Sequence, residues 1–134
     1  MKATGGCHCG AIRYEIEGDP VAHALCHCGD CRKHAGAPVV GWLMLPETAM
    51  RITNGAPIEY ASSENGRRYF CGACGTGVFY RNAATLPGIV DVQSATLDDP
   101  DAAPAPAHIQ TAERISWMKD ADALPAFDRY PPIT

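Results

Sequence analysis

Seven cysteines in three clusters constrain this chain more than any other feature of its sequence. They are Cys7 and Cys9, then Cys26, Cys28 and Cys31, then Cys71 and Cys74. The central three fall within six residues, close enough to converge on a single metal ion. We interpret all seven as zinc ligands, four of them in a closed structural site and the central three in an open, reactive site.

Length and composition favour metal ligation over disulfide bonding. A chain of 134 residues is most simply one domain, residues 1–134, with a core large enough to need no covalent staples. There is no apolar run long enough for a membrane helix and no apolar stretch typical of a secretory signal, so we expect a cytoplasmic protein without a membrane partner. Structural disulfides are rare in that compartment, and seven is an odd number of thiols.

The net charge of the chain limits the classes of molecule that it can bind. The formal net charge is −4, and zinc-bound thiolates would make it more negative. No run of basic residues exceeds two, as at Arg32-Lys33 and Arg67-Arg68. We therefore expect no nucleic-acid partner.

Turn residues and hydrophobic alternation predict a mainly β fold. Thirteen glycines and eleven prolines indicate many turns and few long helices. Residues 11–17 alternate apolar and polar side chains, which predicts a half-buried strand. Further strands are expected at 21–25, 39–45, 50–53, 58–61, 67–70, 76–80, 89–93 and 108–111. Short strands at this spacing favour a compact, mainly antiparallel β domain.

Local signals refine this picture. Asn54-Gly55 predicts a hairpin between strands 50–53 and 58–61, and Asn65-Gly66 predicts a second turn. Residues 32–37 can hold one helical turn before Pro38 stops it. The C-terminal segment 115–130 is expected to pack back on the body through Trp117, Leu124 and Phe127.

The outer cysteine pairs predict the structural site. The two-residue gap between Cys71 and Cys74 lets both sulfurs reach one ion. A redox dithiol is the alternative, but it would begin a helix within a βαβ unit, whereas strands are predicted on both sides here. Cys7 and Cys9 then supply the two ligands that close a tetrahedron, and His8 between them is expected to be exposed.

The central triplet is where function is expected. Three protein ligands leave a fourth tetrahedral position for water or substrate, as in catalytic zinc sites. The alternative is a structural site completed by a nearby histidine: His8, His23, His27 or His34. Zinc with three thiolates is a weak Lewis acid that still binds a soft thiolate, which favours thiol chemistry over hydrolysis.

Polar neighbours of the triplet are weaker candidates. His27 or His34 could shuttle a proton, and Arg32 or Lys33 could attract a carboxylate, although each is also explained as a solvated loop residue. Three aspartates further along are expected to shape turns. They are Asp91, Asp98 and Asp99.

Three segments together resemble one known family. Residues 5–10, 26–33 and 70–76, in this order and spacing, are similar to the glutathione-dependent formaldehyde-activating enzyme family, which also includes centromere protein V. Matches at 96–100, 108–109, Trp117 and 124–127 extend the resemblance over nearly the whole chain.

The resemblance implies a β-tent fold with two zinc ions. One would be structural, on Cys7, Cys9, Cys71 and Cys74, and one catalytic, on Cys26, Cys28 and Cys31. The activity it implies is formation of S-hydroxymethylglutathione from glutathione and formaldehyde, a carbon–sulfur lyase reaction. No residues that would recognise glutathione stand out in the sequence.

Three hypotheses follow. The first is an enzyme in which a thiol, with glutathione as one candidate, adds to a small aldehyde to give a hemithioacetal, while His27 protonates the new alkoxide. The second is a non-catalytic zinc- and thiol-binding module. The third is a nucleic-acid role by analogy with centromere protein V, against which the missing basic patch counts.

Overall fold

The computed structural model describes residues 1–133, and it is mainly β, as the sequence predicts. Its strands are β1 (Lys2–Gly6), β2 (Arg13–Glu17), β3 (Ala22–Cys26), β4 (Val40–Pro46), β5 (Met50–Asn54), β6 (Ile58–Ala61), β7 (Gly66–Phe70), β8 (Gly77–Asn82), β9 (Ile89–Gln93) and β10 (His108–Ile109). Its helix α1 spans Gly29–Ala35, and short 3₁₀ helices span Glu47–Ala49, Ser94–Thr96, Pro100–Ala102, Thr111–Glu113 and Ser116–Ala123.

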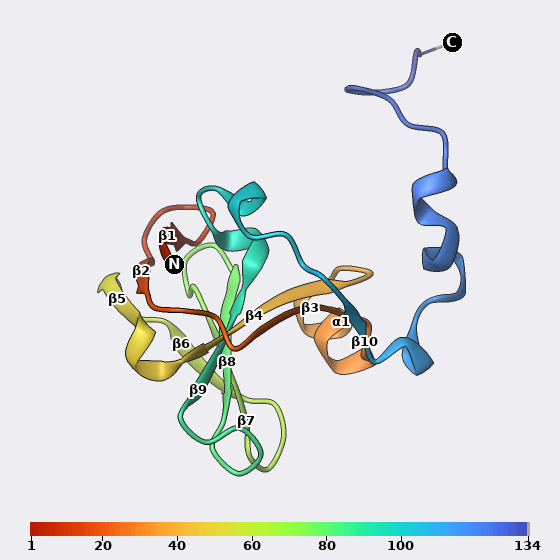
Figure 1. Ribbon diagram of the computed structural model, residues 1–134. Helices are drawn as coiled ribbons and strands as arrows, with labels where there is room; N and C mark the ends of the chain where they lie inside the picture. Colours follow the sequence, from red (N-terminus) through yellow and green to blue (C-terminus); the bar gives the residue numbers. More distant parts are fainter. Residues whose placement is uncertain (134) are drawn as a thin grey trace.

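The strands form two sheets (Figure 1). The smaller has the order β1-β2-β5 and the larger β10-β3-β4-β9-β8-β7-β6. Neighbouring strands are antiparallel, apart from the two-residue pairing of β10 with β3, which is parallel. The predicted mainly antiparallel β fold is thus confirmed, whereas the β-tent name and the single domain stay predictions.

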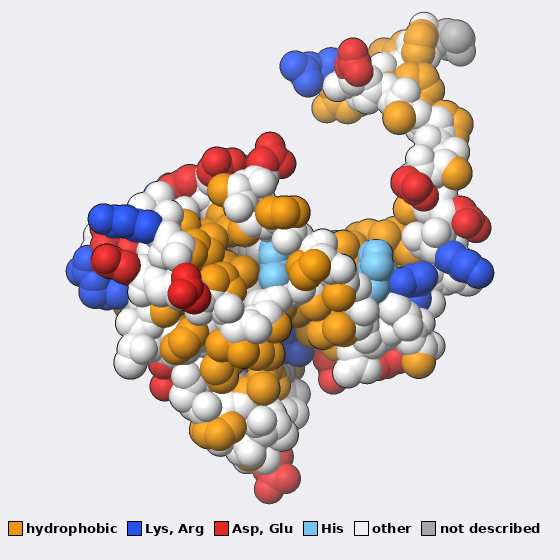
Figure 2. Space-filling view, viewed as in Figure 1, with side chains coloured by type: hydrophobic (Ala, Val, Ile, Leu, Met, Phe, Trp, Pro, Cys, Tyr) orange, Lys and Arg blue, Asp and Glu red, His pale blue; other side chains and the backbone are white. Residues whose placement is uncertain are grey.

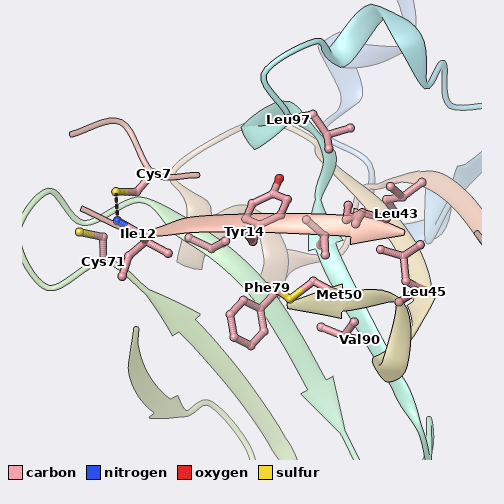
Figure 3. Packing of buried hydrophobic residues seen from close by; sticks show 14 residues of the cluster. Cys7, Ile12, Tyr14, Leu43, Leu45, Met50, Cys71, Phe79, Val90 and Leu97 are labelled. Carbon is pink, nitrogen blue, oxygen red and sulfur yellow. Dashed lines mark hydrogen bonds between the residues drawn. The ribbon is translucent and has the colours of Figure 1, made fainter. Parts of the chain in front are cut away.

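The core lies between the two sheets (Figure 3). In β2 the alternation holds as predicted, because Tyr14 and Ile16 are 1% exposed while Glu15 and Glu17 point to solvent. From the larger sheet, Leu43, Leu45, Phe79, Val90 and Val92 meet this face. The Tyr14 hydroxyl shares a 2.8 Å hydrogen bond with the Thr96 hydroxyl, which satisfies its polar atom within the core.

The predicted hairpin at Asn54-Gly55 is wrong, although both of its strands exist. Strand β5 pairs with β2 in the smaller sheet, and β6 pairs with β7 in the larger. The Asn54 side chain donates a 3.0 Å hydrogen bond to the Ala11 carbonyl, and Gly55 adopts a positive φ of 81° where a Cβ would meet that same carbonyl. The turn therefore packs against Ala11. After it the chain leaves the smaller sheet and enters the larger one at β6.

The prediction that the C-terminal segment packs on the body is also wrong. Residues 115–133 leave the body as an arm (Figure 1), and hydrophobic side chains follow that arm in the space-filling view (Figure 2). Trp117, Leu124 and Phe127 are 59%, 59% and 53% exposed. The 3₁₀ helix Ser116–Ala123 stops at Leu124, and Pro125, Pro131 and Pro132 disfavour any further helix on the arm.

The last strand is shorter than the predicted 108–111. Gln110 adopts a left-handed conformation with a φ of 56°, unusual for a residue other than glycine, and this ends the strand pairing after Ile109. In residues 1–133 no helix has both the length and the apolar character needed to cross a membrane.

Candidate metal centres and the adjoining cavity

Four sulfurs meet where two turns from different sheets come together. Cys7 and Cys9 follow β1, Cys71 and Cys74 lie between β7 and β8, and the four sulfurs all lie within 4.8 Å of one another. We call these residues the four-cysteine cluster. Sulfur separations are 3.6 Å for Cys7–Cys9 and 3.8 Å for Cys9–Cys71. Tetrahedral zinc with bonds of about 2.3 Å requires sulfurs roughly 3.8 Å apart, so this cluster fits the ion.

Hydrogen bonds to two of these sulfurs, Cys7 Sγ and Cys74 Sγ, favour their thiolate form. The Ile12 amide donates to Cys7 Sγ at 3.2 Å, as drawn in Figure 3. The Thr76 hydroxyl lies 3.2 Å from Cys74 Sγ and is the main reason that the pKa of Cys74 falls to about 5. The His8 amide donates to the same hydroxyl oxygen, which joins the two turns, and His8 itself is exposed, as predicted.

The second group, Cys26, Cys28 and Cys31, is the three-cysteine cluster. Cys26 ends β3, Cys28 is the N-cap of α1, and Cys31 lies in the first turn of that helix. The Cys31 amide donates to Cys28 Sγ at 3.3 Å. The helix thus starts earlier than the turn predicted at 32–37, and Gly36 ends it in a left-handed conformation before Pro38.

This cluster also fits a metal ion, with room for another ligand. Its three sulfurs lie within 4.8 Å of one another, and in residues 1–133 no histidine joins them in that grouping. Cys26 and Cys31 are buried and Cys28 is partly exposed. Burial raises the pKa of Cys26 to about 12 and also raises that of Cys31. A metal ion bound there would have to displace the protons of these two thiols.

The three-cysteine cluster opens into a cavity of about 410 Å³, whereas none of the residues that line this cavity belongs to the four-cysteine cluster. The lining residues are Ala22, Ala24, Cys26, Cys28, Asp30, Cys31, Trp42, Met44, Arg68, Tyr80, Asp91, Ile109 and Gln110. Trp42 is 8% exposed and forms part of this wall.

One row of residues across the larger sheet forms a wall of the cavity. Strand register places Ala22 opposite Met44, Met44 opposite Asp91, Asp91 opposite Tyr80, and Tyr80 opposite Arg68. Directly opposed residues share a face of the sheet, so these five side chains lie on the same side. The alternate face, with Leu43, Val92 and Phe79, belongs to the core.

Arg68 brings positive charge to the three-cysteine cluster. Its side chain is 7% exposed, and both terminal nitrogens lie 3.9 Å from Cys31 Sγ. The guanidinium also lies 5.0 Å from the centre of the Tyr80 ring, a cation–π distance. A buried cation is retained where negative charge compensates it, which is what sulfur ligands carry as thiolates.

Asp91 is a buried acid in the same cavity. It is 8% exposed, and its Oδ1 has no hydrogen-bond partner. Burial raises its pKa to about 6. The sequence-based interpretation of Asp91 as a turn residue is wrong, since it lies in the middle of β9. By contrast, Asp98 accepts hydrogen bonds from Arg13 and Thr4, and Arg13 is the main cause of its pKa of about 2.

The predicted polar neighbours of the triplet lie elsewhere. His27 is 1% exposed, its Nε2 lies 2.9 Å from His108 Nδ1, and it is not among the cavity-lining residues. His34 stacks on Tyr60 at 5.9 Å between ring centres. The Arg32 guanidinium donates hydrogen bonds to the backbone carbonyls of His27 and Glu113. These bonds give Arg32 a structural role. Lys33 is exposed.

The grouping of the cysteines could thus be predicted from their spacing, whereas the row of residues opposite the three-cysteine cluster could not. Arg68, Tyr80 and Asp91 stand on three different strands, and strand register alone brings them together. One signal was present: an aspartate in the middle of the apolar stretch Ile89–Gln93 is unusual unless it has a partner or a task.

Fold and site together define a small β protein with two cysteine clusters that could hold metal ions, one of them open to a cavity. The chain belongs to the glutathione-dependent formaldehyde-activating enzyme family, whose family model matches residues 2–113. The family resemblance seen in the sequence is thereby confirmed.

Two further proteins are similar to this chain. A Halomonas elongata protein, named provisionally as a glutathione-dependent formaldehyde-activating enzyme, is 24% identical over 129 residues, which cover 89% of this chain and 81% of the relative. The crystal structure of a Rhodobacter sphaeroides protein aligns with a TM-score of 0.60 and 23% identity, over 78% of this chain and 98% of that one. Because the identity to this second protein is only 23%, the similarity concerns the fold alone.

Proposed function

We propose that this protein is a zinc-dependent enzyme that joins a thiol to a small aldehyde as a hemithioacetal, or splits that adduct, which is carbon–sulfur lyase chemistry. The observation that carries the proposal is the difference between the two clusters. Four sulfurs complete one tetrahedron, whereas the three-cysteine cluster lines a cavity and leaves one position for a substrate.

In this proposal Cys26, Cys28 and Cys31 hold the second ion. Zinc bound there would supply a soft, open coordination position at which a thiol loses its proton near neutral pH. Arg68, 3.9 Å from Cys31 Sγ, offsets the negative charge of the thiolates and so favours binding of one further anionic sulfur. The four-cysteine cluster holds a structural zinc that joins the two sheets.

The family name and the name of the Halomonas relative point to glutathione and formaldehyde as the substrates to test first. Arg68 already contacts Cys31, so the carboxylates of glutathione would have to find partners at the cavity mouth. A reducing compartment such as the cytoplasm would keep the cysteine ligands as thiols, and we retain that location and the absence of a nucleic-acid partner as predictions.

Protonation of the alkoxide by His27, which the residues around the triplet suggested, stays a prediction. The side chain is buried against His108, so a proton from it would have to reach the cavity by way of another group. A direct donor would need to line the cavity itself.

Exchange spectroscopy by NMR tests the proposal directly. Zinc-loaded protein is added to glutathione and formaldehyde at equilibrium, and the rate of exchange between free aldehyde and hemithioacetal is measured. We expect faster exchange with the wild type and only the background rate with Cys28→Ser, whose fold is checked by circular dichroism. Thiol binding without faster exchange would favour the non-catalytic module instead. Equal rates for Cys28→Ser and the wild type would refute the proposed site.

A further inference from the structure

The side chains of the cavity wall change from charged and polar near the sulfurs to apolar farther away. Along the row, Arg68 contacts Cys31, Tyr80 follows, then Asp91, and finally the apolar Met44 and Ala22. Neighbouring strands lie about 4.8 Å apart, so Asp91 stands two strands, on the order of 10 Å, from Arg68. A molecule that extends from the sulfurs along this wall meets the Tyr80 phenol first, then the Asp91 carboxyl group, and then apolar side chains.

Asp91 has no structural partner that would explain its burial. In residues 1–133 it is the one carboxylate among the buried side chains, and its Oδ1 accepts no hydrogen bond. Burying a polar atom without a partner is costly, and proteins keep such groups at functional sites. Since Asp91 lines the cavity, a bound molecule is the available partner.

The groups around Asp91 leave it able to hold a proton. Strand β4 contributes Met44 and Trp42, which are neutral, and β8 contributes the Tyr80 phenol. Across the cavity lie the cysteine sulfurs and Asp30 from the β3–α1 segment, and Arg68 on β7 lies beyond Tyr80. Burial raises the pKa of Asp91 to about 6, so part of the population is protonated near neutral pH.

We propose that this wall is the aldehyde subsite of the enzyme, that Asp91 is the acid that protonates the carbonyl oxygen, and that Met44 and Trp42 contact the carbon substituent. The inference rests on the proposed function and extends it. The substrate class is a small, uncharged aldehyde whose substituent is hydrogen or a short alkyl group, because the row past Asp91 offers apolar contacts.

The step balances without another reactant. The thiolate sulfur attacks the carbonyl carbon and forms the carbon–sulfur bond, while the π pair of the carbonyl moves to oxygen. That oxygen takes the proton of the Asp91 carboxyl group. The proton that the thiol released on binding restores Asp91 through solvent, so one thiol and one aldehyde give one hemithioacetal. In the reverse direction the Asp91 carboxylate accepts the hydroxyl proton.

Asp91→Asn is the test, because the amide keeps the shape of the side chain but cannot transfer a proton. We expect kcat/KM to fall on the order of 100-fold, and the limb of the pH–rate profile near pH 6 to disappear. Zinc content and thiol affinity are measured on the same samples and should match the wild type. Asp91→Glu, which retains an acid, should keep that limb, and Asp101→Asn, an exposed aspartate on a distant 3₁₀ helix, is the matched control.

A series of aldehydes tests the substrate class. We expect the wild type to use formaldehyde, acetaldehyde and propionaldehyde and to discriminate against glyoxylate, which carries a charge. Met44→Ala should lower the ratio of kcat/KM for propionaldehyde over formaldehyde by roughly tenfold, because it removes the apolar contact that the alkyl substituent makes, which is the effect of one or two methylenes in an apolar pocket.

The outcomes separate the two proposals. If the zinc-loaded wild type accelerates no thiol–aldehyde exchange, the proposed function fails and the subsite with it. If the wild type is active but Asp91→Asn keeps both its rate and its pH profile, only the subsite is refuted. Loss of the pH limb in His27→Gln, with Asp91→Asn unaffected, would assign the proton to His27 and overturn the role of Asp91.

Discussion

Both terminal nitrogens of the Arg68 guanidinium lie 3.9 Å from Cys31 Sγ, within hydrogen-bonding reach of a thiolate sulfur. This contact ties the three-cysteine cluster to β7, the strand that ends immediately before Cys71 of the other cluster. One strand therefore connects the two proposed metal sites. Cys71 of the four-cysteine cluster follows the end of this strand, and Arg68 within the strand contacts the three-cysteine cluster.

Replacing Arg68 by methionine should weaken zinc binding at the three-cysteine cluster by about 10- to 100-fold, because an outer partner that stabilises a ligand's charge is lost. Competition with a chromophoric chelator measures the two zinc affinities separately. Arg51→Met is the control, since that side chain is 72% exposed and pairs only with Glu15. Equal weakening in both variants would contradict a specific role for Arg68.

The two clusters should differ in their effect on folding. Cys74→Ser removes a ligand that holds two sheets together, so we expect loss of one zinc and of cooperative unfolding. Cys28→Ser should also lose one zinc but keep its near-wild-type circular dichroism spectrum, because the strands around that cluster are held by their own pairing. Atomic absorption and thermal melts check both. Unfolding in Cys28→Ser alone would reverse the assignment of structural and open sites.

Asp91 should make stability depend on pH. Its pKa is about 6 in the folded protein, against about 4 for an aspartate in the unfolded chain. As pH rises from 4 to 6 the unfolded chain loses this proton first, so stability falls across that range and stays lower above it. The difference in unfolding free energy between Asp91→Asn and the wild type should therefore grow with pH, by about 1–3 kcal/mol between pH 4 and pH 7. Urea titrations at several pH values measure it, and a difference independent of pH would contradict the burial of this acid.

The C-terminal arm should contribute little to the stability of the body. Trp117 is 59% exposed on the arm, whereas Trp42 is 8% exposed in the cavity wall. In Trp42→Phe the remaining fluorescence should be red-shifted and readily quenched by acrylamide, and in Trp117→Phe it should resist quenching. A chain ending at Arg114 should melt within a few degrees of the full chain. Protection of Trp117 from quencher would show that the arm packs on a surface after all.

The features that depend on neighbours along the chain could be predicted before the structure was known. Sulfurs two or three residues apart can converge on one ion only through local turns, so both clusters could be read from spacing together with the need for a fourth ligand. Period-two alternation likewise placed most of the strands, as at Tyr14 and Ile16. The same local information misled at Asn54-Gly55, because a turn signal does not reveal which sheet each flanking strand will join.

The residues that face the three-cysteine cluster could be identified only from the arrangement of the strands in space. Arg68, Tyr80 and Asp91 are separated by more than ten residues from one another along the chain, and they meet because antiparallel register aligns three strands on one face. Register follows from how all the strands pack their apolar sides against the core, which is a property of the whole sheet. The same holds for the arm, whose apolar residues suggested burial although Trp117, Leu124 and Phe127 are more than half exposed.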